Sequence, residues 1–153
     1  MAAADLFRSI VVGTDGSTTA AEALRRAVEL ARHSPATLHV VCAYEPMPGV
    51  RLRVERPALP QQAEWIWGPR DDAETTLAQA VERARAAGVE RVEAFARQGD
   101  PADAILDVAE EQDADLIVVG NRGLTGAKRF LLGGVPNKIS HHAPCSVLII
   151  RTS

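Results

Sequence analysis

The sequence has few cysteines, no long apolar run and no excess of basic charge, and each absence excludes a class of protein. Cys42 and Cys145 are too few for a disulfide framework, so we expect two buried thiols in a reducing compartment. No hydrophobic leader and no apolar run near the roughly 18 residues of a membrane span occurs, which predicts a cytoplasmic protein without a membrane partner. A net charge of −3 gives no general attraction to nucleic acid.

Several signatures of phosphate binding and metal binding are also missing. The Walker pattern GxxxxGK[ST] does not occur, and no GxGxxG follows the first apolar run. His141 and His142 are adjacent, so they point to different sides of a helix and cannot form an i, i+4 metal pair. We therefore predict no resident metal, although Mg²⁺ could arrive with bound ATP, held largely by phosphate and water.

Two other functional interpretations do not fit the positions of the residues in the sequence. Asp15, Ser17 and His141 have the chemistry of a hydrolase triad, but nothing orders them, and Ser17 is better explained as a helix cap. A phosphoreceiver domain needs a phosphoacceptor aspartate after its third strand, whereas Asp100 there precedes Pro101 and suits a helix N-cap. The sequence therefore predicts no catalytic residue.

What the sequence does contain is a regular alternation of apolar runs with helical patterns, over a length that fits one domain, 1–153. The expected strands are 9–14, 37–44, 89–98, 115–120 and 146–150, and the expected helices are 17–33, 71–88, 99–114 and 136–143. All strands except the third are continuous Val/Ile/Leu-rich runs, typical of parallel strands buried on both faces. We predict an α/β fold: a single doubly wound domain with a five-stranded parallel sheet, order 3-2-1-4-5, and helices on both faces.

Local signals predict the ends of several helices. Ser17 and Asp100 are good N-caps. Asp71 or Asp72 can cap the second helix, and Gly88 ends it at the C′ position. The third helix is expected to bury Ile105, Leu106, Val108 and Ala109.

The segment 45–72 interrupts the alternation. It contains five of the nine prolines and both tryptophans, and so many prolines forbid a regular central strand or helix. Trp65 and Trp67 are expected to anchor it onto the body of the domain. A variable surface excursion and a functional lid both fit a proline-rich insertion of this length.

Glycine gathers after the fourth strand, where five glycines fall between Gly120 and Gly134 ahead of a helical pattern. In an open α/β sheet this segment and the stretch "GTDGS" at 13–17 meet beyond the carboxyl ends of the strands, where ligands bind. Both stretches begin helices or turns, so backbone N–H groups point into one crevice. That arrangement is suited to an anion.

The spacing of these glycines favours a phosphate site over tight packing alone. Gly120 and Gly123 let the backbone pass close to a ligand. Gly133 and Gly134 offer unobstructed N–H groups at the start of a helix. The charge of a phosphate could be balanced by the basic residues between them, Arg122, Lys128 and Arg129.

Over essentially its whole length the chain resembles the universal stress protein family. The resemblance is carried by "IVVGTDGS" at 10–17, "GDPADAILDVAEEQDADLIVVGNRG" at 99–123 and "FLLGGVPNKISHHAPCSVLII" at 130–150. Nucleotide-binding members of that family carry G-x2-G-x9-G-[ST]. Gly120, Gly123 and Gly133 match its glycines, and Gly134 stands where Ser or Thr is usual.

The resemblance implies a doubly wound fold with ATP in the crevice. Asp15 and the backbone around Gly13 would meet the adenosine. Ala43 would offer its backbone to the adenine edge, and Gly120 would pass beneath the ribose. Gly123, Gly133, Gly134 and Val135 would surround the phosphates. The whole predicted nucleotide-binding set is Gly13, Thr14, Asp15, Ala43, Val119, Gly120, Arg122, Gly123, Lys128, Gly133, Gly134 and Val135.

The departure at Gly134 leaves the choice of nucleotide open. Its N–H remains, but a side-chain hydrogen bond worth about 1–2 kcal/mol is lost if that bond is charge-assisted. ATP stays the first expectation, with AMP and cyclic AMP as alternatives. Without a convincing base near the γ-phosphate, a nucleotide-binding stress-response regulator is favoured over a weak ATP hydrolase. The retained glycines argue against an adaptor that binds no nucleotide.

The last expected strand, 146–150, is predicted to form a homodimer interface. In the strand order 3-2-1-4-5 it lies at the edge of the sheet, and an apolar edge invites pairing with a second chain. Family members commonly dimerise through this strand, so the resemblance implies the same partner.

Overall fold

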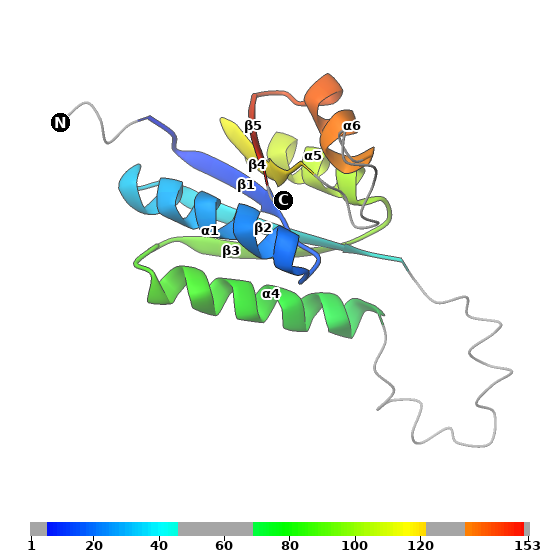
Figure 1. The fold of residues 1–153 in the computed structure, drawn as a ribbon, viewed down its shortest axis with the longest axis horizontal. Coiled ribbons are helices and arrows are strands. Elements are labelled where there is room, and N and C mark those ends of the chain that lie inside the picture. The colour runs from blue at the N-terminus through cyan, green and yellow to red at the C-terminus, as the bar shows by residue number, and fades with distance from the viewer. Residues whose placement is uncertain (1–5, 46–68, 122–133, 152–153) are drawn as a thin grey trace, which may run out of the picture.

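The computed structural model describes residues 6–45, 69–121 and 134–151. These residues form three layers, with a central sheet between two pairs of helices (Figure 1). The strands are β1 (Ser9–Gly13), β2 (Thr37–Tyr44), β3 (Val92–Gln98), β4 (Leu116–Gly120) and β5 (Ser146–Ile150), and the helices are α1 (Thr18–His33), α4 (Pro69–Ala86), α5 (Pro101–Glu111) and α6 (Gly134–His142).

The sheet has the predicted topology. All five strands are parallel and lie in the order β3-β2-β1-β4-β5. In the registers Gly13 lies beside Val41 of β2, and Val12 lies beside Val118 of β4. The direction of winding reverses between β1 and β4, and such a switch point is where open α/β sheets bind ligands.

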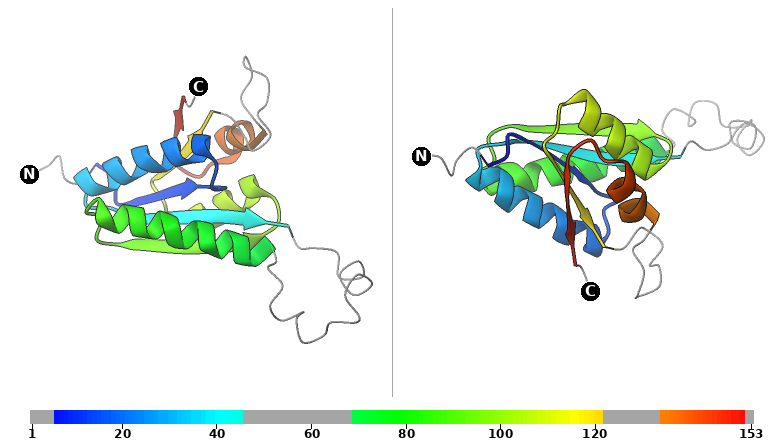
Figure 2. Two further views of the ribbon diagram at one scale, coloured as in Figure 1. Left: turned by 60° about the horizontal axis from the view of Figure 1, so that its bottom comes forward. Right: turned by 90° about the horizontal axis from the view of Figure 1, so that it is seen from above.

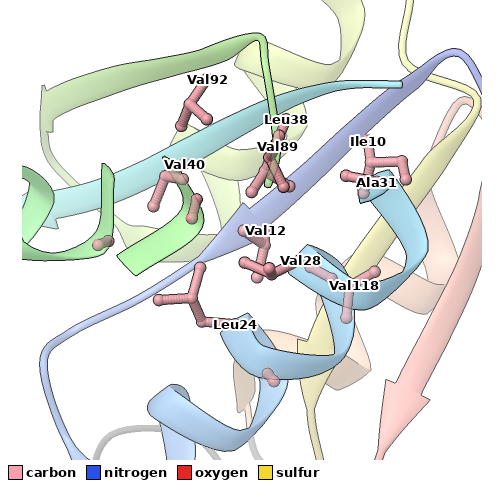
Figure 3. Packing of buried hydrophobic residues seen from close by; sticks show 14 of the residues in the cluster. Ile10, Val12, Leu24, Val28, Ala31, Leu38, Val40, Val89, Val92 and Val118 are labelled. Carbon is pink, nitrogen blue, oxygen red and sulfur yellow. The ribbon is translucent and has the colours of Figure 1, made fainter. Parts of the chain in front are cut away.

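Alternate side chains of each strand enter two apolar layers, one on each face of the sheet. Figure 2 shows the helices that cover these two faces. The layer beneath α1 and α4 is the larger, and Figure 3 shows Leu24 and Val28 of α1 against Val12 of β1. Ala23, Ala27 and Ala31 recur every four residues along α1, so this helix presents a narrow stripe of small side chains to the sheet. The opposite layer lies beneath α5 and α6 and is built mainly from Val11, Val41, Ile105, Val108, Ile117 and Ile139.

Three of the predicted helix signals are confirmed. The Ser17 hydroxyl accepts a hydrogen bond from Ala20 N (3.2 Å), and Asp100 Oδ2 accepts one from Asp103 N (3.0 Å). Gly88 adopts φ 104° just beyond the end of α4. These ends depend on contacts within a few residues, and the sequence therefore predicts them well.

Other boundaries differ from the prediction for identifiable reasons. α4 begins at Pro69, so Asp71 and Asp72 lie in its first turn rather than at its cap. β3 begins only at Val92, because Val89 N donates back to Ala84 O (3.0 Å) and closes the end of α4. α6 begins two residues before 136, since a proline is tolerated in the first turn of a helix. At its far end α5 stops at Glu111, just before Asp113 turns to φ 50°.

The burial of side chains differs from the prediction at three further places. β5 is exposed or half-buried at every residue, because among the described residues it has a neighbouring strand on one side only. Leu106 is half-buried rather than buried, since it lies at the margin of the α5 layer. Of the two free thiols, Cys42 is buried and Cys145 only half-buried.

The proline-rich segment 46–68, with Trp65 and Trp67, lies outside the described residues, and its role as excursion or lid stays a prediction. No helix in the described ranges is long and apolar enough to cross a membrane. The expected cytoplasmic location also stays a prediction.

Candidate functional site

A cleft opens at the carboxyl ends of β1, β2 and β4, where the topology places a ligand site. About 620 Å³ of empty space lies within it, a volume that includes open solvent. Its lining comes from the β1–α1 turn, the strand ends and the first turns of three helices. The described lining residues are Gly13, Thr14, Asp15, Ser17, Thr19, Ala20, Val41, Ala43, Pro101, Ile105, Val119, Gly120, Val135 and Pro136.

The β1–α1 turn fixes the orientation of Asp15. Thr14 N donates to Val41 O (2.9 Å), which ties the turn to β2. Gly16 has φ 82° and donates its N–H to Thr14 Oγ1 (3.2 Å), and Ser17 N donates to Asp15 Oδ1 (2.9 Å). Among the described residues none donates a hydrogen bond to Asp15 Oδ2, so that oxygen is available to a ligand.

Gly13 lets α5 approach the centre of the sheet. A Cβ at this position would overlap Ile105 Cδ1 and lie 3.1 Å from Ile105 Cγ1. The Ile105 side chain therefore covers Gly13, and both residues line the cleft. This contact gives the glycine a packing role that is independent of any ligand.

The amino ends of α1, α5 and α6 all border the cleft. Ser17 caps α1, Pro101 is the first residue of α5, and Val135 lies in the first turn of α6. Unpaired N–H groups and the helix dipole make each of these ends partially positive. Their convergence favours an anionic group in the cleft.

Cys42 of β2 has a buried thiol. Burial, aided by the nearby Asp15 carboxylate, raises the pKa of Cys42 to about 11. The thiol is therefore protonated at neutral pH, and since the thiolate is the nucleophile, Cys42 is a packing residue rather than a reactive one.

Known proteins resemble this chain over nearly all of its length. The sequence model of the universal stress protein family matches residues 6–151. The chain belongs to the universal stress protein family. A universal stress protein of Mycobacterium tuberculosis H37Rv is 37% identical over 147 residues, which cover 96% of this chain and 98% of that relative.

Solved structures of family members also resemble this chain. The crystal structure of a universal stress protein in complex with cAMP has a TM-score of 0.71 and is 34% identical, covering 96% of this chain and 98% of its own. A universal stress protein from Lactobacillus plantarum has a TM-score of 0.75 at 24% identity, covering 94% of this chain and 97% of its own, and so shares the fold.

In this universal stress protein, seven of the twelve residues predicted to bind nucleotide lie together in the cleft: Gly13, Thr14, Asp15, Ala43, Val119, Gly120 and Val135. Gly134 is the first residue of α6 and is not part of the lining. Arg122, Gly123, Lys128 and Gly133 lie outside the described residues, as does Arg129.

The sequence prediction missed half of the described lining. The missed residues are Ser17, Thr19, Ala20, Val41, Pro101, Ile105 and Pro136. The sequence does mark Ser17 and Pro101 as residues at the start of helices, and helices that follow parallel strands start at the edge of the sheet where ligands bind, so these two residues are predictable. Val41 and Ile105 resemble ordinary core residues, and their position beside the cleft depends on the three-dimensional packing.

Proposed function

We propose that this universal stress protein binds an adenine nucleotide in the cleft, with ATP as the first candidate. One observation carries the proposal. Residues that the sequence predicts to bind nucleotide come from distant parts of the chain, and they line a single cleft beside the amino ends of three helices. The 34% identical relative in complex with cAMP supports an adenine nucleotide as the ligand class.

In this proposal the β1–α1 turn binds the adenosine. Asp15 Oδ2 accepts a hydrogen bond from the adenosine, and the Ala43 backbone meets the adenine edge. Thr14 and Val119 form the walls, and Gly120 passes beneath the ribose. Gly123, Gly133, Gly134 and Val135 surround the phosphates, with Arg122 and Lys128 balancing their charge and Mg²⁺ accompanying ATP.

A smaller nucleotide, cyclic AMP or AMP, is the second candidate. Gly134 lacks the hydroxyl that the family pattern places beside the phosphates, which weakens the case for a long phosphate chain. The relative in complex with cAMP shows that a family member 34% identical to this chain takes a monophosphate.

We propose that the protein acts as a nucleotide-responsive regulator rather than as an ATP hydrolase. Hydrolysis needs a group that positions or deprotonates the attacking water. Asp15 is the single carboxylate in the described lining, and its Oδ1 is already bonded to Ser17 N. In the proposal this carboxylate belongs to adenosine recognition, away from the phosphates.

Identifying the nucleotide that co-purifies with the protein tests the ligand class directly. The protein would be denatured and the released small molecules identified by mass spectrometry. Calorimetric titration of nucleotide-free protein with ATP, AMP and cyclic AMP then ranks the candidates. If none of the three binds, the proposed function is wrong.

Asp15→Ala should weaken the binding of ATP, AMP and cyclic AMP by a similar factor, since the contact is to the adenosine that all three ligands share. A lost charge-assisted hydrogen bond is worth about 1.5–3 kcal/mol, roughly 10- to 150-fold in affinity. Asp107→Ala removes an exposed carboxylate of α5 that does not line the cleft, and should change nothing. Loss of ATP turnover with unchanged affinity would instead make Asp15 catalytic.

A further inference from the structure

An ion cluster joins α5 to α6 beside the cleft. Lys138 Nζ of α6 lies 2.7 Å from Asp103 Oδ1 and 3.5 Å from Asp100 Oδ2, at the amino end of α5. Asp100 Oδ2 also accepts the capping hydrogen bond from Asp103 N (3.0 Å). The three side chains thus form one connected group with a net formal charge of −1.

This cluster is close to the cleft wall on both helices. Asp100 directly precedes the lining residue Pro101, and consecutive Cα atoms are about 3.8 Å apart. Lys138 follows the lining residue Val135 by three residues, a rise of roughly 4.5 Å along a helix. The backbone of the cluster therefore lies within roughly 5 Å of residues that line the cleft, which is less than the Debye length of about 10 Å at 0.1 M salt, so salt only partly screens these charges from the cleft wall.

Two carboxylates at this place oppose the binding of phosphate. The amino ends of the helices attract an anion, but Asp100 and Asp103 sit at the amino end of α5 and counter that attraction. Lys138 cancels one of their two negative charges. The bond to Asp103 and the charge of both aspartates raise the pKa of Lys138, which keeps the ammonium cationic at physiological pH.

We propose that Lys138 is a specificity-determining residue of the cleft: by cancelling one of the two negative charges of Asp100 and Asp103, it permits ligands that carry phosphate charge. The inference rests on the proposed function. A purely mechanical role is the competing explanation, in which the ion pair only holds α6 against α5. The two roles differ in how the effect of removing Lys138 depends on ligand charge.

The test is calorimetric titration of wild type and Lys138→Met with adenosine, AMP and ATP, without divalent cations and at about 0.01 M salt. Methionine keeps the length of the side chain and removes its charge. Coulomb's law at roughly 10 Å in water gives about a twofold loss of affinity for each unit of ligand charge at this ionic strength. We expect the affinity for ATP to fall most, the affinity for AMP to fall less, and the affinity for adenosine not to change. In about 1 M salt, where the Debye length is near 3 Å, the difference should vanish.

A double variant separates charge from mechanical contact. Lys138→Met with Asp103→Asn restores the cluster to a net −1 while the ion pair stays broken, so we expect ATP affinity to return toward wild type. Arg32→Met is the control, because it removes one positive charge from the last turn of α1, at the far end of that helix from the cleft. It should alter none of the three affinities.

The outcomes are distinct. Equal weakening of adenosine, AMP and ATP by Lys138→Met, or no recovery in the double variant, assigns Lys138 a mechanical role and overturns the inference. Wild-type ATP affinity in Lys138→Met also overturns it, while leaving nucleotide binding intact. A wild-type protein that binds none of the three ligands refutes the proposed function, and the inference with it.

Discussion

At the scale of single residues, His39 on β2 holds a buried hydrogen-bond chain. Its side chain is nearly inaccessible, with Nε2 3.0 Å from Ser9 Oγ, and Ser9 Oγ donates to Gln112 O (3.2 Å). Because a serine has one hydroxyl proton, Nε2 carries the proton in the bond to Ser9. In the neutral ring Nδ1 is then an acceptor that faces another acceptor, Glu93 Oε1, at 3.3 Å without a hydrogen bond.

This arrangement makes stability depend on pH. Burial lowers the pKa of His39 below its usual 6.5, and the opposing effect of Glu93 is smaller. The unfolded chain therefore binds this proton more readily than the folded one. The contribution of neutral His39 is fully present above about pH 6.5 and is lost as the pH falls below that value, by at most about 1.4 kcal/mol per pH unit.

His39→Gln should flatten this dependence between pH 7 and pH 5, as measured by urea unfolding at each pH. His33→Gln is the control, because His33 is exposed on α1 and only pairs with Glu29. An unchanged slope in His39→Gln would mean that another group carries the pH dependence.

Substitution of Gly13 tests the close approach of α5 to the sheet. Gly13→Ala places a methyl group against Ile105 Cδ1 and should destabilise the fold by about 1–3 kcal/mol, the usual range for overpacking. Ile105→Val removes the Cδ1 methyl. The double variant should therefore be more stable in thermal unfolding than the sum of the two single effects predicts. Strict additivity would show that the two side chains do not collide.

At the scale of elements, the amino end of α6 is the place where this chain departs from the family pattern. A Cβ built on Gly134 meets no atom of the described residues within 4 Å, so a serine fits there without displacing a neighbour. Gly134→Ser should strengthen ATP binding by about 1–2 kcal/mol, roughly 5- to 30-fold, by adding a hydroxyl donor to phosphate. Gly134→Ala has the same Cβ without the hydroxyl and should give no gain. Equal affinities of the serine and alanine variants for ATP would place the phosphates elsewhere.

At the scale of the whole molecule, β5 is the edge of the sheet and the proposed homodimer interface. Ile150 O accepts from Asn121 N (2.8 Å) on the β4 side. Successive residues of a strand present their backbone groups to opposite edges, so Val147 and Ile149 present theirs to the open edge. Leu148 is 37% exposed on this strand. An apolar edge with which no described strand pairs favours pairing with a second chain across a two-fold axis.

Leu148→Lys should shift the protein toward monomer, because it brings two like charges together near the axis and opposes burial. Ile149→Pro should act likewise, since it removes an N–H that faces the partner while the bonds to β4 remain. Leu6→Lys is the control, because Leu6 is also exposed (67%) but lies outside the sheet. Light scattering across a dilution series measures the change. A wild-type monomer at tens of micromolar, or dimers that persist in both β5 variants, would place the interface elsewhere.

The sequence by itself determined the features that depend on neighbouring residues. Ser17 and Asp100 cap their helices through bonds three residues away, and Gly88 ends α4 through its own backbone conformation. The alternation of apolar runs with helical patterns likewise determined the parallel, doubly wound sheet, because chain connectivity leaves few other arrangements. The edge of the sheet where the cleft lies followed from the shared direction of the strands.

Tertiary structure decided what depends on side chains that are far apart in the sequence. The Ile105 side chain that covers Gly13 comes from a helix about ninety residues later in the chain. The bonds from Ser9 to Asp115 and Gln112 span 106 and 103 residues. Lys138 meets Asp103 only because α5 and α6 pack on the same face of the sheet. No local pattern encodes such contacts, since each depends on the packing distance between two elements and on the side chains that fill it.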